Sequence, residues 1–146
     1  MSYDLDLFTP QANLDPIAII QGAALISDSA RTHSNQVTMR HLERDNPNFH
    51  VKVSDDVIQV MDEVEGIRIT LYATGAQVSI PFWYTDDAVI EIAFQTAQHY
   101  ILIILSHTGY AVYDPQLSRI VDIERDLTEM IRAYKQALRG MQSFLG

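Results

Sequence analysis

The chain contains no cysteine and few basic residues, and both shortages narrow the functions open to it. Without cysteine it has no disulfide, no thiolate metal site and no cysteine nucleophile, a composition compatible with a reducing compartment. Ten lysines and arginines face nineteen acids, which gives a formal net charge of -9. Because nucleic acids and anionic membranes attract basic surfaces, this balance argues against a nucleic-acid or membrane partner.

The sequence also lacks a targeting or membrane-inserting pattern near its start. The apolar run from Ile17 to Ile26 is far shorter than the roughly 20 residues that a membrane span requires, and no basic segment precedes an apolar one. We therefore expect a cytoplasmic protein. With 146 residues, 47% of them hydrophobic, residues 1–146 fit a single domain with its own core.

Catalytic and metal-binding motifs are missing. The six glycines form no phosphate-binding loop and no nucleophile elbow. The five histidines are scattered, with no pair at helical spacing that could gather a metal. The neighbouring acids Asp55-Asp56 and Asp86-Asp87 occupy turn and helix-cap positions that favour water, so they lack the apolar enclosure that acid–base catalysis requires. We predict no catalytic residue, no cofactor, no metal and therefore no enzyme.

The negative charge is concentrated in one region. Residues 53–91 carry eight acids against Arg68 alone, for a net charge of -7. A surface of one sign steers partners of the opposite sign, although acidity also promotes solubility. The acids of this region are Asp55, Asp56, Asp62, Glu63, Glu65, Asp86, Asp87 and Glu91.

Apolar and polar residues alternate in several segments with the period of a half-buried strand. These segments are residues 2–8, 49–53, 57–61, 67–72 and 76–83, followed by a shorter one within 108–114. Gly66 and Gly75 lie in short connections, where glycine can take the positive φ that hairpin turns demand. The last strand of the series should end at Pro81 or lie at an edge, because proline donates no ladder hydrogen bond.

Four segments have helical spacing or helix-start signals. They are residues 16–27, 34–45, 87–105 and 122–140. The first is apolar nearly all round, which predicts burial rather than a face reserved for a partner. In the third, Gly109 suits the C-terminal cap region, and one face should pack on the sheet: Val89, Ile92, Ala93, Thr96, Tyr100, Ile103 and Ile104. The expected fold is α+β, a single domain with an antiparallel sheet of about four to six strands and helices mainly on one face.

Three aromatic residues stand in a row at Phe82-Trp83-Tyr84. Alternate side chains of a strand face opposite ways, so they cannot all enter one core. Trp83 or Tyr84 should therefore reach the surface, where both residue types are common binding anchors, unless they complete the core at the strand end.

Three stretches together resemble a broad family of small bacterial proteins. They are "SYDLDLF", "IRITLYATGAQVSIPFW" and "TGYAVYDPQLSRIVD". Members of the family begin with a Ser-Tyr-Asp-Leu strand, carry an Ile-Pro-Tyr-Trp-like segment and end a strand with Tyr-Asp-Pro-Gln. This chain departs from that pattern with Phe82 in place of the usual tyrosine and Tyr84 where a histidine is often found, so no role of that histidine carries over.

Many members of this family are similar to immunity proteins encoded beside secreted bacterial toxins. The resemblance implies a protein that binds and blocks a toxin domain, and the regional charge of -7 suits a partner with a basic surface. Within this interpretation the Asp114-Pro115-Gln116 segment is a structural corner, because Pro115 fixes φ and Asp114 can accept backbone N–H groups. The expected contact residues are Asp55, Asp56, Asp62, Glu63, Glu65, Trp83, Tyr84, Asp86, Asp87 and Glu91. Two other functions stay open: a small enzyme or ligand-binding domain with a pocket between sheet and helices, and a subunit of a larger assembly. The sequence does not indicate an oligomeric state.

Overall fold

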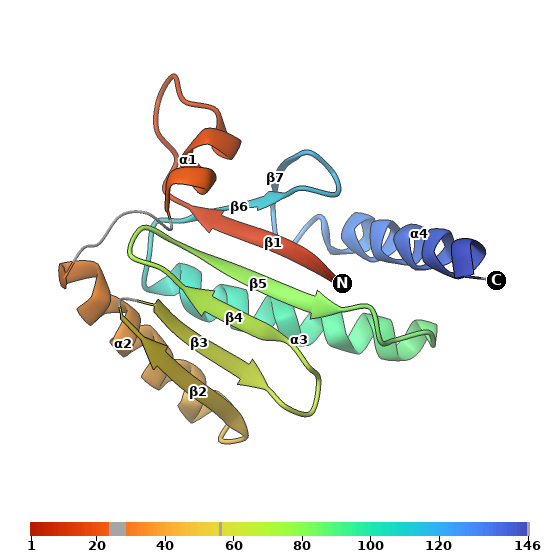
Figure 1. The fold of residues 1–146 in the computed structure, drawn as a ribbon, viewed down its shortest axis with the longest axis horizontal. Coiled ribbons are helices and arrows are strands. Elements are labelled where there is room, and N and C mark those ends of the chain that lie inside the picture. The colour runs from red at the N-terminus through yellow and green to blue at the C-terminus, as the bar shows by residue number, and fades with distance from the viewer. Residues whose placement is uncertain (24–28, 56, 146) are drawn as a thin grey trace.

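The protein, as a computed structural model, folds into an α+β domain around one antiparallel sheet, and the structure describes residues 1–23, 29–55 and 57–145 (Figure 1). The elements in chain order are β1 (Ser2–Phe8), α1 (Pro16–Ala23), α2 (Ser29–Asp45), β2 (Phe49–Ser54), β3 (Val57–Asp62), β4 (Arg68–Leu71), β5 (Gly75–Pro81), α3 (Asp87–Ser106), β6 (Ala111–Asp114), β7 (Arg119–Val121) and α4 (Leu127–Leu145). The expected fold class is confirmed.

The sheet has seven strands in the order β2-β3-β4-β5-β1-β6-β7, and every pairing is antiparallel. The series from β2 to β5 follows the chain as consecutive hairpins, as the alternation predicts, and β5 ends at Pro81. The expected number of four to six strands was too low, because β7 spans only three residues and is too short for a period to be visible. Of the two expected turn glycines, Gly66 takes a φ of 72°, whereas Gly75 already begins β5.

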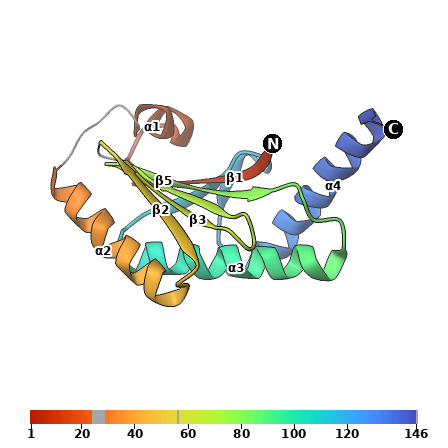
Figure 2. The ribbon, with the colours of Figure 1, turned by 60° about the horizontal axis from the view of Figure 1, so that its bottom comes forward.

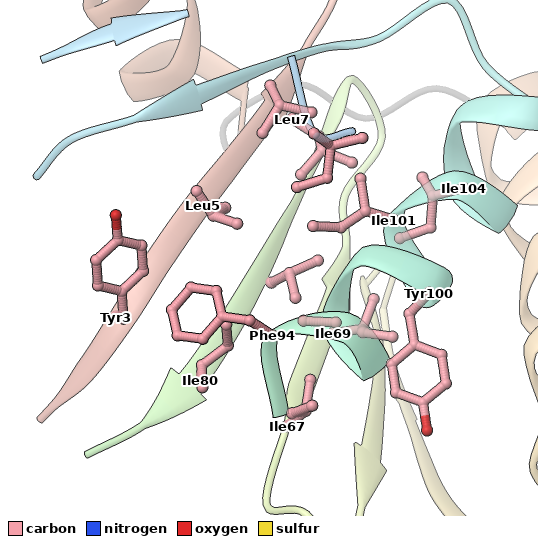
Figure 3. Close-up of a cluster of buried hydrophobic side chains, with 14 of the residues drawn as sticks. Tyr3, Leu5, Leu7, Ile67, Ile69, Ile80, Phe94, Tyr100, Ile101 and Ile104 are labelled. Atoms are coloured by element: carbon pink, nitrogen blue, oxygen red, sulfur yellow. The ribbon is translucent and has the colours of Figure 1, made fainter. Parts of the chain in front are cut away.

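One face of the sheet is covered by α2 and α3, and α1 lies on the other side (Figure 2). Helix α4 lies at the end of the sheet where β5 finishes, and its Tyr134 hydroxyl donates to the carbonyl oxygen of Pro81 at 2.6 Å. Side chains from β1 and β5 meet α3 in the core, where Leu5, Ile80 and Ile101 are each no more than 1% exposed (Figure 3). The Tyr3 ring packs edge-on against Phe94, with centroids 5.4 Å apart. Burial of this apolar surface is the main force that holds α3 on the sheet.

The predicted inner face of α3 was right for Ala93, Tyr100 and Ile104 and wrong for the other residues named. The residues that α3 buries are Ile90, Ala93, Phe94, Ala97, Tyr100, Ile101 and Ile104, whereas Val89 and Ile92 are 41% and 51% exposed. The helix is apolar on most sides, so several different sets of its apolar residues have helical spacing, and the pattern alone does not identify the buried set. Within the described residues α3 is also the one helix long and apolar enough to cross a membrane by length and composition, and its packing on the sheet accounts for that composition.

The first helix was expected to be buried, and it is not. Ile17 is 46% exposed, and Ile19 and Ile20 are half-buried. A helix of two turns beside β1 can press only one side against the sheet, so its remaining apolar side chains meet solvent. The expected end of this helix near Ser27 lies outside the described residues.

The boundaries of the other helices shift for local reasons. Helix α2 begins at Ser29 rather than near residue 34, and it ends at Asp45, before Pro47, as expected. Helix α4 begins at Leu127 rather than Asp122, because the Asp122 carboxylate accepts the N–H groups of Glu124 at 3.0 Å and Arg125 at 3.2 Å and forms a separate turn. The C-cap of α3 is His107 with a φ of -108°, so Gly109 supplies no left-handed cap.

The Asp114-Pro115-Gln116 segment is a structural corner, as predicted. Asp114 is fully buried, and its Oδ1 accepts the N–H of Gln116 at 2.8 Å and of Leu117 at 3.2 Å. The Tyr3 hydroxyl of β1 donates to Oδ2, which links the corner to an interior strand of the sheet. Burial raises the pKa of the Asp114 carboxyl above its ordinary value, and the hydrogen bonds oppose that rise.

Candidate functional site

One end of the sheet gathers several of the predicted contact residues. The turn from β3 to β4 and the connection from β5 to α3 leave the sheet at the same end, since β3 and β5 run in the same direction on either side of β4 (Figure 1). Residues 63–66 and 82–84, together with Arg68, form what we call the Trp83 surface. It holds Glu63, Glu65, Trp83 and Tyr84 from the expected set.

The turn at this end is built on Asp62, which was expected on the surface but is only 2% exposed. Its Oδ1 accepts the N–H groups of Val64 at 3.0 Å and Glu65 at 3.1 Å. Its Oδ2 accepts the Tyr100 hydroxyl at 2.7 Å and the Asn46 amide at 3.2 Å. Asp62 therefore shapes the turn and contacts no partner directly, because its side chain is covered by the protein itself.

Trp83 is the most prominent side chain of the surface, with 68% of the residue exposed. Its six-membered ring lies directly over Gly66, so that a methyl group at position 66 would overlap the ring at Cζ3 and Cη2. The positive φ of Gly66 is the second reason why this position suits glycine. The ring is thus fixed on one side by the turn and open to solvent on the other.

Tyr84 anchors the connection instead of extending from it. Its hydroxyl donates to the carbonyl oxygen of Glu65 and lies 3.2 Å from the Glu65 carboxylate. Its backbone N–H donates to the Tyr134 hydroxyl of α4 at 3.4 Å. Burial and the neighbouring Glu65 raise the pKa of Tyr84 above its ordinary value, so the hydroxyl stays protonated and serves as a donor. Tyr84 is half-buried and positions its neighbour Trp83.

A groove of about 330 Å³ lies beside Trp83 on the face of the sheet away from α3. It is lined by Met1, Ser2, Met61, Gly66, Arg68, Ser79, Pro81 and Trp83. Val64, in the same β3–β4 turn as Gly66, is 75% exposed. Sequence reasoning placed Gly66 in a turn but missed its contact with Trp83, the exposed Val64 and the groove, because only the pairing of β3, β4 and β5 brings the two loops to one end of the sheet.

The remaining predicted acids do not form one patch with the Trp83 surface. Asp86 caps α3 and accepts the N–H groups of Ala88 at 3.0 Å and Val89 at 3.2 Å. Asp87 pairs with Lys135 of α4 at 3.1 Å, and Glu91 is exposed on the next turn of α3. Asp55 lies in the β2–β3 turn, one strand length or about 17 Å from the Asp62 end. Asp56 lies outside the described residues.

A second groove, of about 370 Å³, lies where the end of α2 meets α3. His99 Nε2 is 2.6 Å from the Asp45 carboxylate there, and both side chains are solvent-accessible, by 56% and 32%. Asn46 and Tyr100 line the same groove. The described residues contain no group of three or more side chains that could hold a metal ion.

The other histidines make local contacts. His50 lies 3.9 Å from Glu63, and the His41 and His107 rings pack with centroids 4.3 Å apart. The side chain of His33 is outside the described part of the chain.

No protein-family model, no curated protein and no solved structure matches this chain. The contacts of the described residues and the motifs of the sequence are therefore the basis for a functional proposal.

Proposed function

We propose that this protein is a cytoplasmic immunity protein that binds a bacterial toxin domain through the Trp83 surface and blocks it by occupancy. The toxin as partner comes from the resemblance of the SYDL, IPFW and YDPQ segments to immunity proteins. The binding face comes from the geometry. An exposed tryptophan held rigidly over a glycine, beside a groove and acidic side chains, has the composition of an interface hot spot.

The single observation that carries the proposal is the exposure of Trp83. A tryptophan that completed the core would be covered, yet 68% of this residue is accessible, and its ring lies against Gly66 on one side. Exposing so large an apolar ring is unfavourable in water, and contact with a partner would remove that surface from solvent. Glu63 and Glu65 beside it favour a partner with basic groups around the contact.

The decisive experiment is co-expression of this protein with the product of the neighbouring gene, combined with a pull-down of the purified pair. Protection of growth through a stable stoichiometric complex is the expected result, and Trp83→Ala should weaken that complex at least tenfold. Val53→Ala is a matched control, because Val53 is 59% exposed on the edge strand β2, away from the Trp83 surface. If Trp83→Ala and Val53→Ala weaken the complex equally, the Trp83 surface is not part of the interface.

A second function, a small enzyme or ligand-binding domain, is favoured by the groove that holds His99 and Asp45. A histidine oriented by a carboxylate is a general base in many sites. The hydroxyl groups of Thr96 and Tyr100, which line the same groove, donate to the Ile92 carbonyl and to Asp62. This function predicts protection at sub-stoichiometric amounts of protein, and its loss in His99→Ala. Occupancy predicts full protection only at equimolar amounts, with His99→Ala active.

A further inference from the structure

We propose that the groove beside Trp83 receives an acidic side chain of the partner protein, which Arg68 binds through its guanidinium group. This inference rests on the proposed function and adds one feature to it. The contact surface of the partner is then basic around a single central carboxylate, opposite an acidic rim with a single central arginine.

Arg68 is the only cation among residues 53–91, and it pairs with none of their acids that the structure describes. Its place in β4 explains why. Arg68 faces away from α3 and lies directly between Met61 of β3 and Ser79 of β5, neither of which is charged. A cation in a region of charge -7 is thus left available in the groove.

The nearest acids in sequence are held in other directions. Asp62 is buried with Tyr100 on the helix side of the sheet. Glu63 lies next to His50 at 3.9 Å, and the Glu65 carboxylate lies next to the Tyr84 hydroxyl at 3.2 Å. On the same face, Asp4 of β1 lies one strand beyond Arg68, opposite Ser79, and accepts the Ser2 hydroxyl at 2.6 Å. None of these acids forms an ion pair with Arg68.

The chemistry of the groove selects a carboxylate as the bound group. A guanidinium presents parallel N–H donors that match the two oxygens of a carboxylate, and a positive charge would be repelled by it. The Trp83 ring and Met61 line the same groove. Contact with the partner would cover this lining and remove water from around the ion pair, which strengthens the attraction.

The openness of the site indicates a protein side chain rather than a free small acid. Sites for small molecules enclose most of the ligand, whereas Trp83 and Met1, which both line the groove, are 68% and 92% exposed. Arginine and tryptophan together, in the middle of an exposed apolar area, are typical of the centre of a protein interface.

The first test uses blocked five-residue peptides, Lys-Gly-Glu-Gly-Lys and its Gln counterpart, and follows the fluorescence of Trp83, the only tryptophan in the chain. We expect the Glu peptide to bind at least fivefold more tightly than the Gln peptide, and Arg68→Gln to abolish the difference. Lys52→Gln is a matched control that should preserve it, because Lys52 is an exposed cation on the same face of the sheet. Equal binding of both peptides to the wild type would overturn the proposal. Free acetate serves as the small-acid comparison, and a change in Trp83 fluorescence with acetate equal to that with the Glu peptide would also overturn it.

The second test uses the purified partner of the pull-down. Arg68→Gln should weaken the complex at least tenfold, and Arg68→Lys should restore only part of the loss, since lysine supplies the charge without the paired donors. Loss of binding in Trp83→Ala but not in Arg68→Gln would leave the proposed function standing and overturn this inference. Unchanged binding in both variants would overturn the two together.

Discussion

Two turns of this protein are built on the same device and serve different ends. Asp62 ends β3 and Asp114 ends β6, each carboxylate accepts the N–H groups two and three residues further on, and each accepts a tyrosine hydroxyl from another element. The two aspartates are 2% and 0% exposed. A charged group so well covered is stable only because several donors replace the water it has lost.

The turns differ in what they place outside. After Asp114 the chain returns directly into β7, so the corner adds a strand to the sheet. After Asp62 the chain forms a turn with an exposed valine at its tip and a glycine that supports the Trp83 ring. In both turns the buried aspartate fixes a reversal of the chain. Whether the turn only extends the sheet or also presents exposed side chains depends on the residues that follow the aspartate.

The largest effect should come from Asp114→Ala. The substitution leaves the Tyr3 hydroxyl and two backbone N–H groups without their buried acceptor, which should lower the free energy of unfolding by about 2 to 4 kcal/mol. Urea denaturation measures the loss. Binding to the partner per folded molecule and the emission of Trp83 should stay at wild-type values, and a change in either would make the corner part of the site.

Asp114→Asn is the control for charge. Because burial raises the pKa of Asp114 in the folded state, the folded protein holds this proton more tightly than the unfolded chain does. The contribution of this proton to the free energy of unfolding is fully present below the pKa of aspartate in the unfolded chain, near 4. It is lost as the pH rises through the pKa of Asp114 in the folded protein. The stability of the wild type relative to Asp114→Asn should therefore fall with rising pH, and a parallel pair of curves would contradict the assignment.

Asp62→Ala should cost less stability, about 1 to 3 kcal/mol, because Asn46 and Tyr100 already share a hydrogen bond of 3.0 Å and remain paired after the loss. Unlike Asp114→Ala, it should release the turn below Trp83, change the tryptophan emission and weaken partner binding beyond the fraction unfolded. The two alanine variants therefore distinguish a turn with a structural role alone from a turn that also supports the Trp83 surface. Unchanged tryptophan emission in Asp62→Ala would show that the Asp62 turn does not support Trp83.

The same pair of turns shows what the sequence could predict. Asp114 precedes a proline at the end of an apolar run, a local signal that identified the corner correctly. Asp62 stands in a series of surface acids, and its count toward the regional charge made it look exposed. Its true partners, Tyr100 and Asn46, are 38 and 16 residues away, so only the tertiary fold reveals them.

Other parts of the fold follow the same division. Strand β1 was predicted at its observed limits because partly exposed and buried residues alternate from Ser2 to Leu7 and Thr9-Pro10 follows Phe8. The inner face of α3 and the exposure of α1 were mispredicted, since apolar residues on all sides of a helix do not say which side the sheet will cover. Strand alternation predicted that Trp83 or Tyr84 reaches the surface, and it is Trp83 that does so. The contact of Trp83 with Gly66 depends on two neighbouring loops and was not predicted.

Gly66→Ala tests that support directly. The new methyl group would overlap the Trp83 ring and must adopt a φ near 72°, which residues other than glycine disfavour. We expect a loss of about 1 to 2 kcal/mol in stability and a shift in the emission of Trp83. Gly109→Ala is the matched control, because a methyl group there meets no atom within 4 Å and the backbone of Gly109 has a negative φ. Equal behaviour of the two variants would show that Trp83 does not depend on Gly66 for its position.

The smallest expected effect compares single charges at the two ends of the sheet. Glu63 borders the Trp83 surface, while Asp55 lies one strand length or about 17 Å away, beyond the screening length of about 10 Å at 0.1 M salt. At that ionic strength Glu63→Gln should slow association with a basic partner about two- to threefold, whereas Asp55→Asn should leave the rate within error. Stopped-flow measurements on the purified pair would show the difference, and dissociation rates should change little because rim charges act mainly on encounter. If Asp55→Asn slows association as much as Glu63→Gln does, the acidic region acts through its total charge. The encounter with the partner would then not be directed to the Trp83 surface.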